Sequence, residues 1–493
     1  MRHGNRLECL VNMNRLTELF EAILQASCPP NVITAKLLNR NEAAPWLSRS
    51  LLAALLITAR CVFADSYWQG STSGFNVAGS WNPAGVPTGI NAINDSGSNN
   101  VVLIRPGDPV WRPWDIRAGD GVNASGSYLQ TGSTNVVNGW FRLGDSANST
   151  GYYTLSNGTV NVLLQAHVGE AGVGVLTVSG GTFNVGQNPF CLGDGDFGAG
   201  GMGTLNMNGG TLNTALGVDL WLGEGHNNGP GGTGKMIMTG GAVNIGGWFA
   251  IGRFGGIGDL ELSGGSITMS PGNAGNITLA TTPSTGVVNQ TGGVLTNTVS
   301  QTWVAESASG TWNLNGGTDV LSVALLTRLS GANGTFNLNG GDLFATQILD
   351  PGGNGTFNFN GGILHARANS ASFLQATHAI TVKAGGAFIN SEGHDITIAQ
   401  TLANGGGGGL TKLGPGSLTL SGSLSYSGAT IVSNGTLIVS APNTFASTNC
   451  IVAGAATFGV VLASANVQLS VPALTIAAGG GLSFNFVGVG GQP

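Results

Sequence analysis

The chain has 493 residues, of which 85 are Gly and only 8% are charged. A hydrophobic fraction of 41% is ample for a core and excludes a disordered chain, while so little charge is atypical of a cytosolic enzyme. The first 64 residues hold seven of the 17 Lys and Arg and four of the 23 Asp and Glu, which leaves ten basic and nineteen acidic residues. This acidic balance argues against a nucleic-acid partner, which would need a basic patch.

Residues 1–64 have the features of a leader that ends in a signal peptide. Arg49 precedes an apolar run over residues 51–59, and "VFA" ends at Ala64 with small or apolar residues. The run is too short to span a bilayer, so we expect secretion and no transmembrane segment in the mature chain. A short buried helix is the alternative interpretation of this run.

Residues 65–125 are rich in Trp and precede a long series of repeats. We interpret them as an N-terminal cap, because the open first coil of a repeat array must be covered. Four indoles, which are also the candidate carbohydrate contacts of the chain, belong to this region: Trp68, Trp81, Trp111 and Trp114. We favour a role in the core of the cap over contact with a sugar.

Residues 126–400 consist of repeats marked by Gly-Gly or Asn-Gly turns. Eleven such turns lie between Gly132 and Gly385, and their shorter spacings cluster near 24 residues. Around each turn apolar and polar residues alternate with a period of two, as in "TWNLNGG", which indicates strands and not helices. Three short strands and three turns in about 24 residues are typical of one coil of a right-handed parallel β-helix.

Stacking of these coils predicts ladders of identical side chains. Four Asn residues fall at one equivalent position of successive repeats: Asn161, Asn184, Asn213 and Asn244. In the repeat over residues 203–225, Leu205, Met207 and Leu212 are expected to point inward, Gly209 to form a corner and Leu222 to anchor the third side. A β-propeller is excluded because its blades are longer and carry a different signature.

Acidic residues recur directly after a Leu-Gly or Val-Gly pair in four successive repeats: Asp145, Glu170, Asp194 and Glu224. Stacking would bring equivalent residues within about 5 Å of one another. The densest part is "GDGD" beneath "GEGH", where Asp194 would lie near Glu224. Asp196 would likewise lie near His226. These four residues form a candidate cation site, for which Ca²⁺ is the expected ion because it prefers hard oxygen ligands.

Two other interpretations of this acidic column stay open. Two carboxyl groups about 5 Å apart would also suit retaining glycoside hydrolysis. The interpretation that we favour is a polar turn whose like charges are relieved by solvent, because the column changes sign at Arg253. The residues before Leu-Gly do not form an aromatic ridge for sugars, since they read Arg142, His167, Cys191, Trp221, Ala250 and Trp303.

Two cysteines follow the leader, Cys191 and Cys450. They lie about ten coils apart and have no zinc-binding spacing, so we expect both to be small core side chains without a disulfide. No cofactor is expected apart from the Ca²⁺ considered above.

Residues 401–441 contain a more specific pattern, "GGGGGLTKLGPGSLTLSGSLSYSGATIVSNGTLIVSA". It resembles the autotransporter-associated β-strand repeat of secreted and surface bacterial proteins at Leu410, Thr411, Lys412, Gly414, Gly416, Leu418, Leu420, Gly422, Tyr426, Gly428, Thr430, Gly435 and Leu437. The resemblance implies an extracellular β-helical stalk. Residues 442–493 continue as further coils and end within the pattern.

These observations predict a secreted or cell-surface β-helical rod, structural or adhesin-like, without catalytic activity. Its partners would be extracellular glycans or other surface components. The alternatives are a polysaccharide lyase or glycoside hydrolase on the same fold, or a glycan-binding rod. Fold alone cannot carry an enzymatic assignment, and the basic residues that a lyase needs are scattered singly along the chain.

Overall fold

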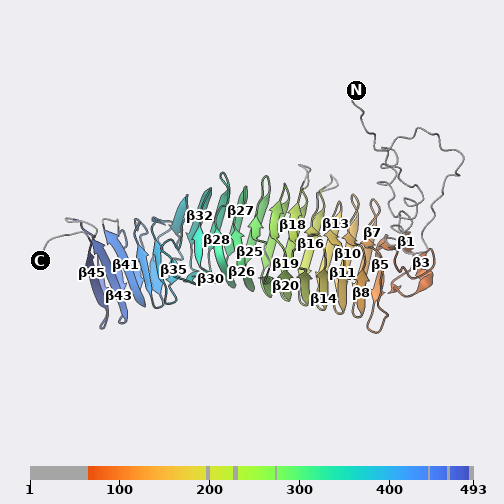
Figure 1. The fold of residues 1–493 in the computed structure, drawn as a ribbon, viewed down its shortest axis with the longest axis horizontal. Coiled ribbons are helices and arrows are strands. Elements are labelled where there is room, and N and C mark those ends of the chain that lie inside the picture. The colour runs from red at the N-terminus through yellow and green to blue at the C-terminus, as the bar shows by residue number, and fades with distance from the viewer. Residues whose placement is uncertain are drawn as a thin grey trace, which may run out of the picture.

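The chain forms a parallel β-solenoid of about 17 turns with about 24 residues per turn (Figure 1). The computed structural model describes residues 65–195, 200–225, 231–272, 275–441, 445–462 and 467–487. The expected leader lies outside these ranges. The turn count exceeds the eleven Gly-Gly turns because coils near both ends of the solenoid use other turn residues. Among the described residues, no helix has the length and hydrophobicity needed to cross a membrane.

The first side of the solenoid is a 14-stranded sheet. Its strands are β2 (Ser73–Gly74), β5 (Ser96–Ile104), β7 (Ser125–Gln130), β10 (Thr150–Leu155), β13 (Val173–Val178), β16 (Met202–Met207), β19 (Thr233–Met238), β22 (Ile257–Leu262), β25 (Thr285–Gln290), β27 (Ser309–Leu314), β29 (Asn333–Leu338), β32 (Asn354–Phe359), β34 (Ala379–Val382) and β37 (Leu402–Asn404).

The second side belongs to a 26-stranded sheet. Its strands are β8 (Thr134–Val137), β11 (Thr159–Val162), β14 (Thr182–Val185), β17 (Thr211–Thr214), β20 (Ala242–Ile245), β23 (Ser266–Met269), β26 (Val294–Trp303), β28 (Thr318–Leu325), β30 (Asp342–Ala345), β33 (Ile363–Ala366), β35 (Ala387–Asn390), β38 (Leu410–Leu413), β40 (Thr430–Val432), β42 (Cys450–Val452) and β44 (Leu474–Ile476).

The third side belongs to the same sheet. The long strands β26 and β28 connect the two sides, because each pairs with a second-side strand near its start and with a third-side strand near its end. The third side comprises β1 (Asp65–Trp68), β4 (Asn91–Asn94), β6 (Ile116–Ala118), β9 (Trp140–Leu143), β12 (Gln165–Val168), β15 (Phe190–Leu192), β18 (Leu220–Glu224), β21 (Phe249–Arg253), β24 (Ile277–Leu279) and β31 (Gln347–Leu349), with β3 (Trp81–Asn82) antiparallel to β1 after the 3-10 helix η1 (Ala78–Ser80). A five-stranded sheet follows toward the C-terminal end: β36 (Asp395–Ile398), β39 (Ser417–Leu420), β41 (Gly435–Ala441), β43 (Ala456–Leu462) and β45 (Gly481–Phe486).

The inward residues of each coil form a continuous core. In the coil of residues 203–225, Leu205 and Met207 on β16, Leu212 on β17 and Leu222 on β18 are fully buried, which confirms the period-two prediction. Burial of such a side chain contributes about 1.5–3 kcal/mol. Gly210 turns the corner with φ of 67°, a conformation that favours glycine.

Asparagine ladders run along the outer face of the second side, as the repeat alignment predicts. The Nδ2 atom of Asn184 donates to Oδ1 of Asn161 over 2.8 Å, and Asn213 and Asn244 continue the ladder at the same distance. On the first side, a second ladder links Asn289, Asn313, Asn337 and Asn358. Each amide therefore ties one coil to the next without a charged group.

A column of ten glycines, which the turn spacing did not predict, occupies the second position of the first-side strands. Their register is continuous through Gly126, Gly151, Gly174, Gly203, Gly234, Gly258, Gly286, Gly310, Gly334 and Gly355. At Gly234 an added Cβ would lie 2.2 Å from Leu192 O and 2.2 Å from Gly223 N. The corner between the third and first sides is therefore too tight for a side chain.

The N-terminal end is filled by aromatic side chains. Trp68 and Trp81 pack edge to face with ring centroids 4.9 Å apart, and Phe75 stacks on Trp111 at 4.7 Å. All three of these indoles are 2% exposed or less, so they are not available to stack on a sugar ring. The carbohydrate-contact prediction is corrected for these three, because the core at this end takes up their surface; Trp114 is half-buried.

One inward position carries an acid. Asp319 on β28 is fully buried, and its register partners are Leu295 and Leu343. Burial raises the pKa of Asp319 to about 8, although the side chains of Trp312 and Gln290 act in the opposite direction. The carboxyl group is therefore neutral in the folded chain over most of the acid range.

Candidate functional site

A corner between the third and first sides aligns the recurrent acids. All of them except Asp95, which follows Asn94, come directly after a glycine that turns the chain. Gly193 has φ of 67°, and an added Cβ there would lie 2.1 Å from Thr233 O. Backbone hydrogen bonds hold the following residues in register, such as Asp194 N to Gly169 O over 2.9 Å and Glu224 N to Gly193 O over 2.9 Å. The column, which we term the acidic ladder, comprises Asp95, Asp120, Asp145, Glu170, Asp194 and Glu224.

The acidic ladder is longer and more buried than the sequence suggested. Glu170, Asp194 and Glu224 are 1%, 1% and 4% exposed. The expectation that solvent relieves their repulsion is therefore wrong, because these side chains are almost entirely withdrawn from solvent. Like charges at this depth need counter-charges or protons instead.

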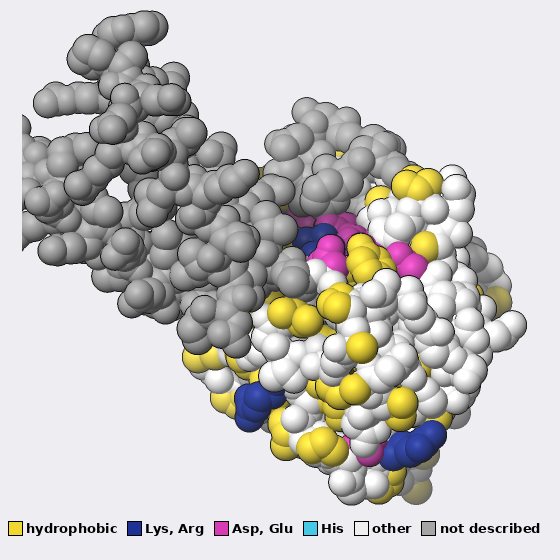
Figure 2. Space-filling view, turned by 90° about the vertical axis from the view of Figure 1, so that its right-hand side faces the viewer, with side chains coloured by type: hydrophobic (Ala, Val, Ile, Leu, Met, Phe, Trp, Pro, Cys, Tyr) yellow, Lys and Arg dark blue, Asp and Glu magenta, His cyan; other side chains and the backbone are white. Residues whose placement is uncertain are grey.

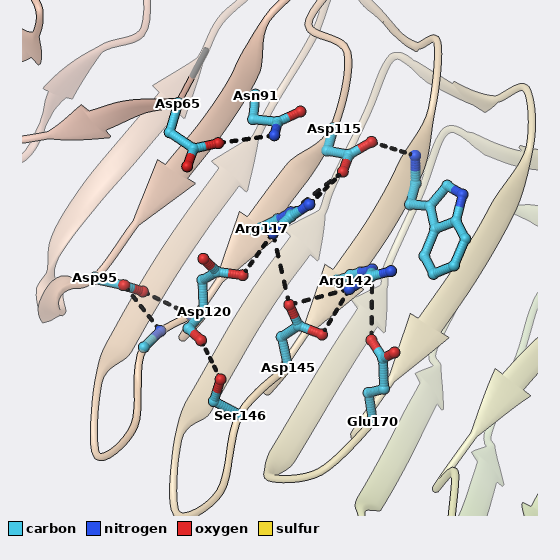
Figure 3. Close-up of polar contacts among 12 residues, drawn as sticks. Asp65, Asn91, Asp95, Asp115, Arg117, Asp120, Arg142, Asp145, Ser146 and Glu170 are labelled. Atoms are coloured by element: carbon cyan, nitrogen blue, oxygen red, sulfur yellow. Dashed lines mark hydrogen bonds and ion pairs between the residues drawn. The ribbon is translucent and has the colours of Figure 1, made fainter. Parts of the chain in front are cut away.

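Two arginines supply the counter-charge at the N-terminal part of the ladder (Figure 3). Arg117 contacts Asp115 at 2.8 Å and Asp120 at 3.0 Å. Arg142, one coil further on, contacts Asp145 at 3.1 Å, and its Nε lies 3.5 Å from Glu170 Oε2. Acidic and basic side chains also meet at the N-terminal end of the rod, beside hydrophobic ones (Figure 2).

Protonation of some of the carboxyl groups removes the remaining negative charge. Burial, with a hydrogen bond to Asp145, raises the pKa of Asp120 to about 7 and that of Glu170 to about 10. Burial alone would raise the pKa of Asp145 as well. Hydrogen bonds from Glu170 and Asp120, together with the attraction of Arg142, outweigh burial and hold the pKa of Asp145 below its usual range. Asp145 is therefore the ionised member, and Glu170 is neutral at pH 7.

The C-terminal part of the ladder has a different composition. His167 and Cys191 occupy the column position that Arg142 occupies one coil earlier. His167 Nδ1 lies 2.8 Å from Asp194 Oδ2, and Cys191 Sγ lies 3.9 Å from Glu224 Oε2. Asp194 and Glu224 occupy adjacent rungs of the ladder, since Glu224 N donates to Gly193 O, whereas Asp196 and His226 lie outside the described residues. Cys191 is buried as expected, but its neighbours are polar.

An aromatic cleft lies further along the third side. It has a volume of about 300 Å³ and is lined by Asp219, Trp248, Ala250, Arg253, Phe254, Thr278, Thr281, Thr282, Glu306 and Ser307. Trp248 packs edge to face on Trp303 at 5.3 Å, and the Arg253 guanidinium lies 4.0 Å from the ring centre of Trp221. This cluster is not evident from the sequence, because Trp248 stands in a different column from Trp221 and Trp303.

The segment from β38 to β41 closes two coils around one buried lysine. Nζ of Lys412 donates to the carbonyl oxygens of Leu413 at 2.8 Å, Gly414 at 2.8 Å and Asn434 at 3.2 Å. The hydroxyl groups of Tyr426 and Thr430 lie 2.6 Å apart inside the next coil. Burial lowers the pKa of Lys412 to about 8. These contacts explain why a lysine, a tyrosine and glycine turns occur at these spacings.

Residues 410–439 match the family model described as Passenger-associated-transport-repeat. This segment is similar to that repeat. The resemblance to the autotransporter-associated repeat family is thereby confirmed, and the repeat corresponds to the coils closed by Lys412. The comparisons with curated proteins and with solved structures gave no significant match. A passenger repeat on a β-solenoid fits a surface rod.

Proposed function

We propose that the chain is a secreted or surface-exposed rod with a structural or adhesin-like role and no catalytic activity. The observation that carries this proposal is the passenger-associated-transport-repeat at residues 410–439, set in the same solenoid as the preceding coils. The stacked strands favour an extended scaffold, because each coil contacts only the coils before and after it. Hydrogen bonds between successive coils along the sheets would make this scaffold stiff. The half-buried Arg117 and Arg142 support the same role, since they compensate charge within the corner.

Protease treatment of intact cells of the source organism tests this location. We expect the chain to be degraded on intact cells or recovered from the medium, while a cytosolic marker stays protected. Retention of the whole chain with the cytosolic marker would contradict the proposal. Release of unsaturated or reducing sugars from acidic and neutral polysaccharides by the purified chain would instead favour the enzymatic alternative.

The aromatic cleft supports a second candidate, glycan binding by the rod. Trp248 offers a half-exposed indole, while Asp219, Arg253 and Glu306 place charged groups around it. Aromatic surface beside a few polar groups is the composition of sites that bind sugars and similar polar ligands. This cleft replaces the buried indoles of the N-terminal end as the carbohydrate-contact candidate.

Substitution Trp248→Ala is expected to weaken binding of an oligosaccharide selected from a neutral and acidic panel by about fivefold, since an aromatic contact contributes about 1 kcal/mol. Calorimetric titration measures the affinity. The matched control is Trp140→Ala, which removes another half-buried indole outside the cleft and should leave affinity unchanged. Equal losses in both variants would contradict a site at the cleft.

A further inference from the structure

Three potential metal ligands lie close together at the C-terminal part of the acidic ladder, and a fourth side chain from the next coil approaches one of them. One ring nitrogen of His167, Sγ of Cys191 and one carboxylate oxygen of Asp194 all lie within 4.8 Å of one another. Glu224 brings Oε2 to 3.9 Å from the same sulfur atom. All four residues are at most 4% exposed.

The histidine points to a ligand at this cluster. Its Nδ1 lies 2.8 Å from Asp194 Oδ2, yet within the described part of the chain neither ring nitrogen of His167 makes a hydrogen bond of acceptable geometry. An imidazole buried to this extent with both nitrogens unsatisfied is costly unless something else binds it. Stacking of its ring on Trp140, with centroids 5.7 Å apart, fixes its orientation.

The spacing suits a small tetrahedral ion. Two ligands bound to one Zn²⁺ at about 2.0–2.3 Å lie roughly 3.4–3.6 Å apart. The distance of 3.9 Å between Cys191 Sγ and Glu224 Oε2 is slightly longer than this spacing. The distance of 2.8 Å between His167 Nδ1 and Asp194 Oδ2 is slightly shorter, so small side-chain movements would bring both pairs to it. One thiolate, one imidazole and two carboxylates are donors that Zn²⁺ accepts, whereas Ca²⁺ takes oxygen ligands alone.

We propose that His167, Cys191, Asp194 and Glu224 bind one Zn²⁺ ion and so clamp three successive coils of the rod. The ion would neutralise the carboxylates at a part of the ladder where His167 and Cys191 stand in the column of Arg142, while Arg253 follows Glu224 at the next rung. Zinc here takes the role that Arg142 has one coil earlier. This site does not depend on the proposed surface location or on glycan binding, so it is tested separately.

The experiment uses the full chain with cobalt as the probe. Elemental analysis of the purified protein should find one zinc per chain, and exchange into Co²⁺ should give a thiolate-to-cobalt charge-transfer band. Cys191→Ser should abolish the band and weaken zinc binding by at least about tenfold. The matched control is Cys450→Ser, since Cys450 is equally buried but lies on β42 far along the rod, and it should keep the band.

Two further variants keep the test independent of folding. His167→Gln and Glu224→Gln change a ligand with little change in volume, and each should weaken zinc binding while circular dichroism stays that of a β-protein. A cobalt complex without a thiolate band in the unmodified chain would overturn the proposal. Survival of the band in Cys191→Ser would do the same, as would stabilisation by Ca²⁺ with no uptake of Zn²⁺.

Discussion

Asp319→Asn is expected to stabilise the chain at alkaline pH relative to the unmodified protein. Asp319 is fully buried, and its pKa in the folded chain is about 8 against an ordinary value of 3.8. The folded state therefore keeps a proton that the unfolded state releases between these two values. Stability from this group is complete below about pH 4 and is lost as the pH rises through 8.

The expected size follows from the linkage between protonation and folding. Between pH 5 and pH 9 the unmodified chain should lose about 4 kcal/mol that the Asn variant keeps, since each tenfold change in proton concentration below the folded-state pKa corresponds to 1.36 kcal/mol. Glu170 and Asp120 also have raised pKa values and contribute in the same direction in both proteins. The difference between the two proteins therefore isolates Asp319.

Denaturant unfolding at several pH values measures this difference. The matched control is Asp259→Asn, which removes a partly exposed carboxylate paired with Lys235 at 2.7 Å. Its profile from pH 5 to 9 should follow that of the unmodified chain, because a surface ion pair contributes at most about 1 kcal/mol. Parallel profiles for Asp319→Asn and the unmodified chain would show that Asp319 is ionised in the folded state.

The period of the sequence predicts the fold because the same residues recur where the coils stack. Leu205, Leu212 and Leu222 could be assigned to three inward sides from alternation and turn spacing alone. The Asn161 ladder could be predicted for the same reason, since equal spacing puts equal side chains in contact. These features depend only on the alternation of apolar and polar residues and on the constant spacing of the coils, and both can be recognised in the sequence.

The candidate site was less predictable because its parts come from different coils and columns. The repeat alignment places Asp194 next to Glu224. The contacts of His167 with Asp194 and of Cys191 with Glu224 depend on the position of the third-side strands relative to the corner, which the repeat spacing does not give. Burial of the acids was also missed, since a Gly-Asp pair after a strand looks like an exposed turn in any single repeat. Burial of Asp319 could not be predicted from its residue type, because its position is apolar in the neighbouring repeats, at Leu295 and Leu343, and a carboxyl group is usually exposed.

Gly234→Ala is expected to be among the most damaging single-methyl additions to the rod. Gly234 lies in the middle of the glycine column, and its added Cβ would meet backbone atoms of Leu192 and Gly223 at 2.2 Å. Backbone atoms of two coils cannot move aside independently, because each is hydrogen-bonded to the next. We expect a loss of at least about 3 kcal/mol, at the upper end of overpacking in a core.

Gly217→Ala is the control that separates steric conflict from backbone strain. Gly217 has φ of 82°, but nothing lies within 4 Å of an added Cβ, so its cost should be only about 1–2 kcal/mol. Hydrogen exchange should show protection lost around β16, β19 and β22 in Gly234→Ala, while distant coils stay protected because a solenoid opens locally. Equal destabilisation by the two variants would mean that the corner has room for a side chain, and that the glycine column serves chain flexibility instead of close packing.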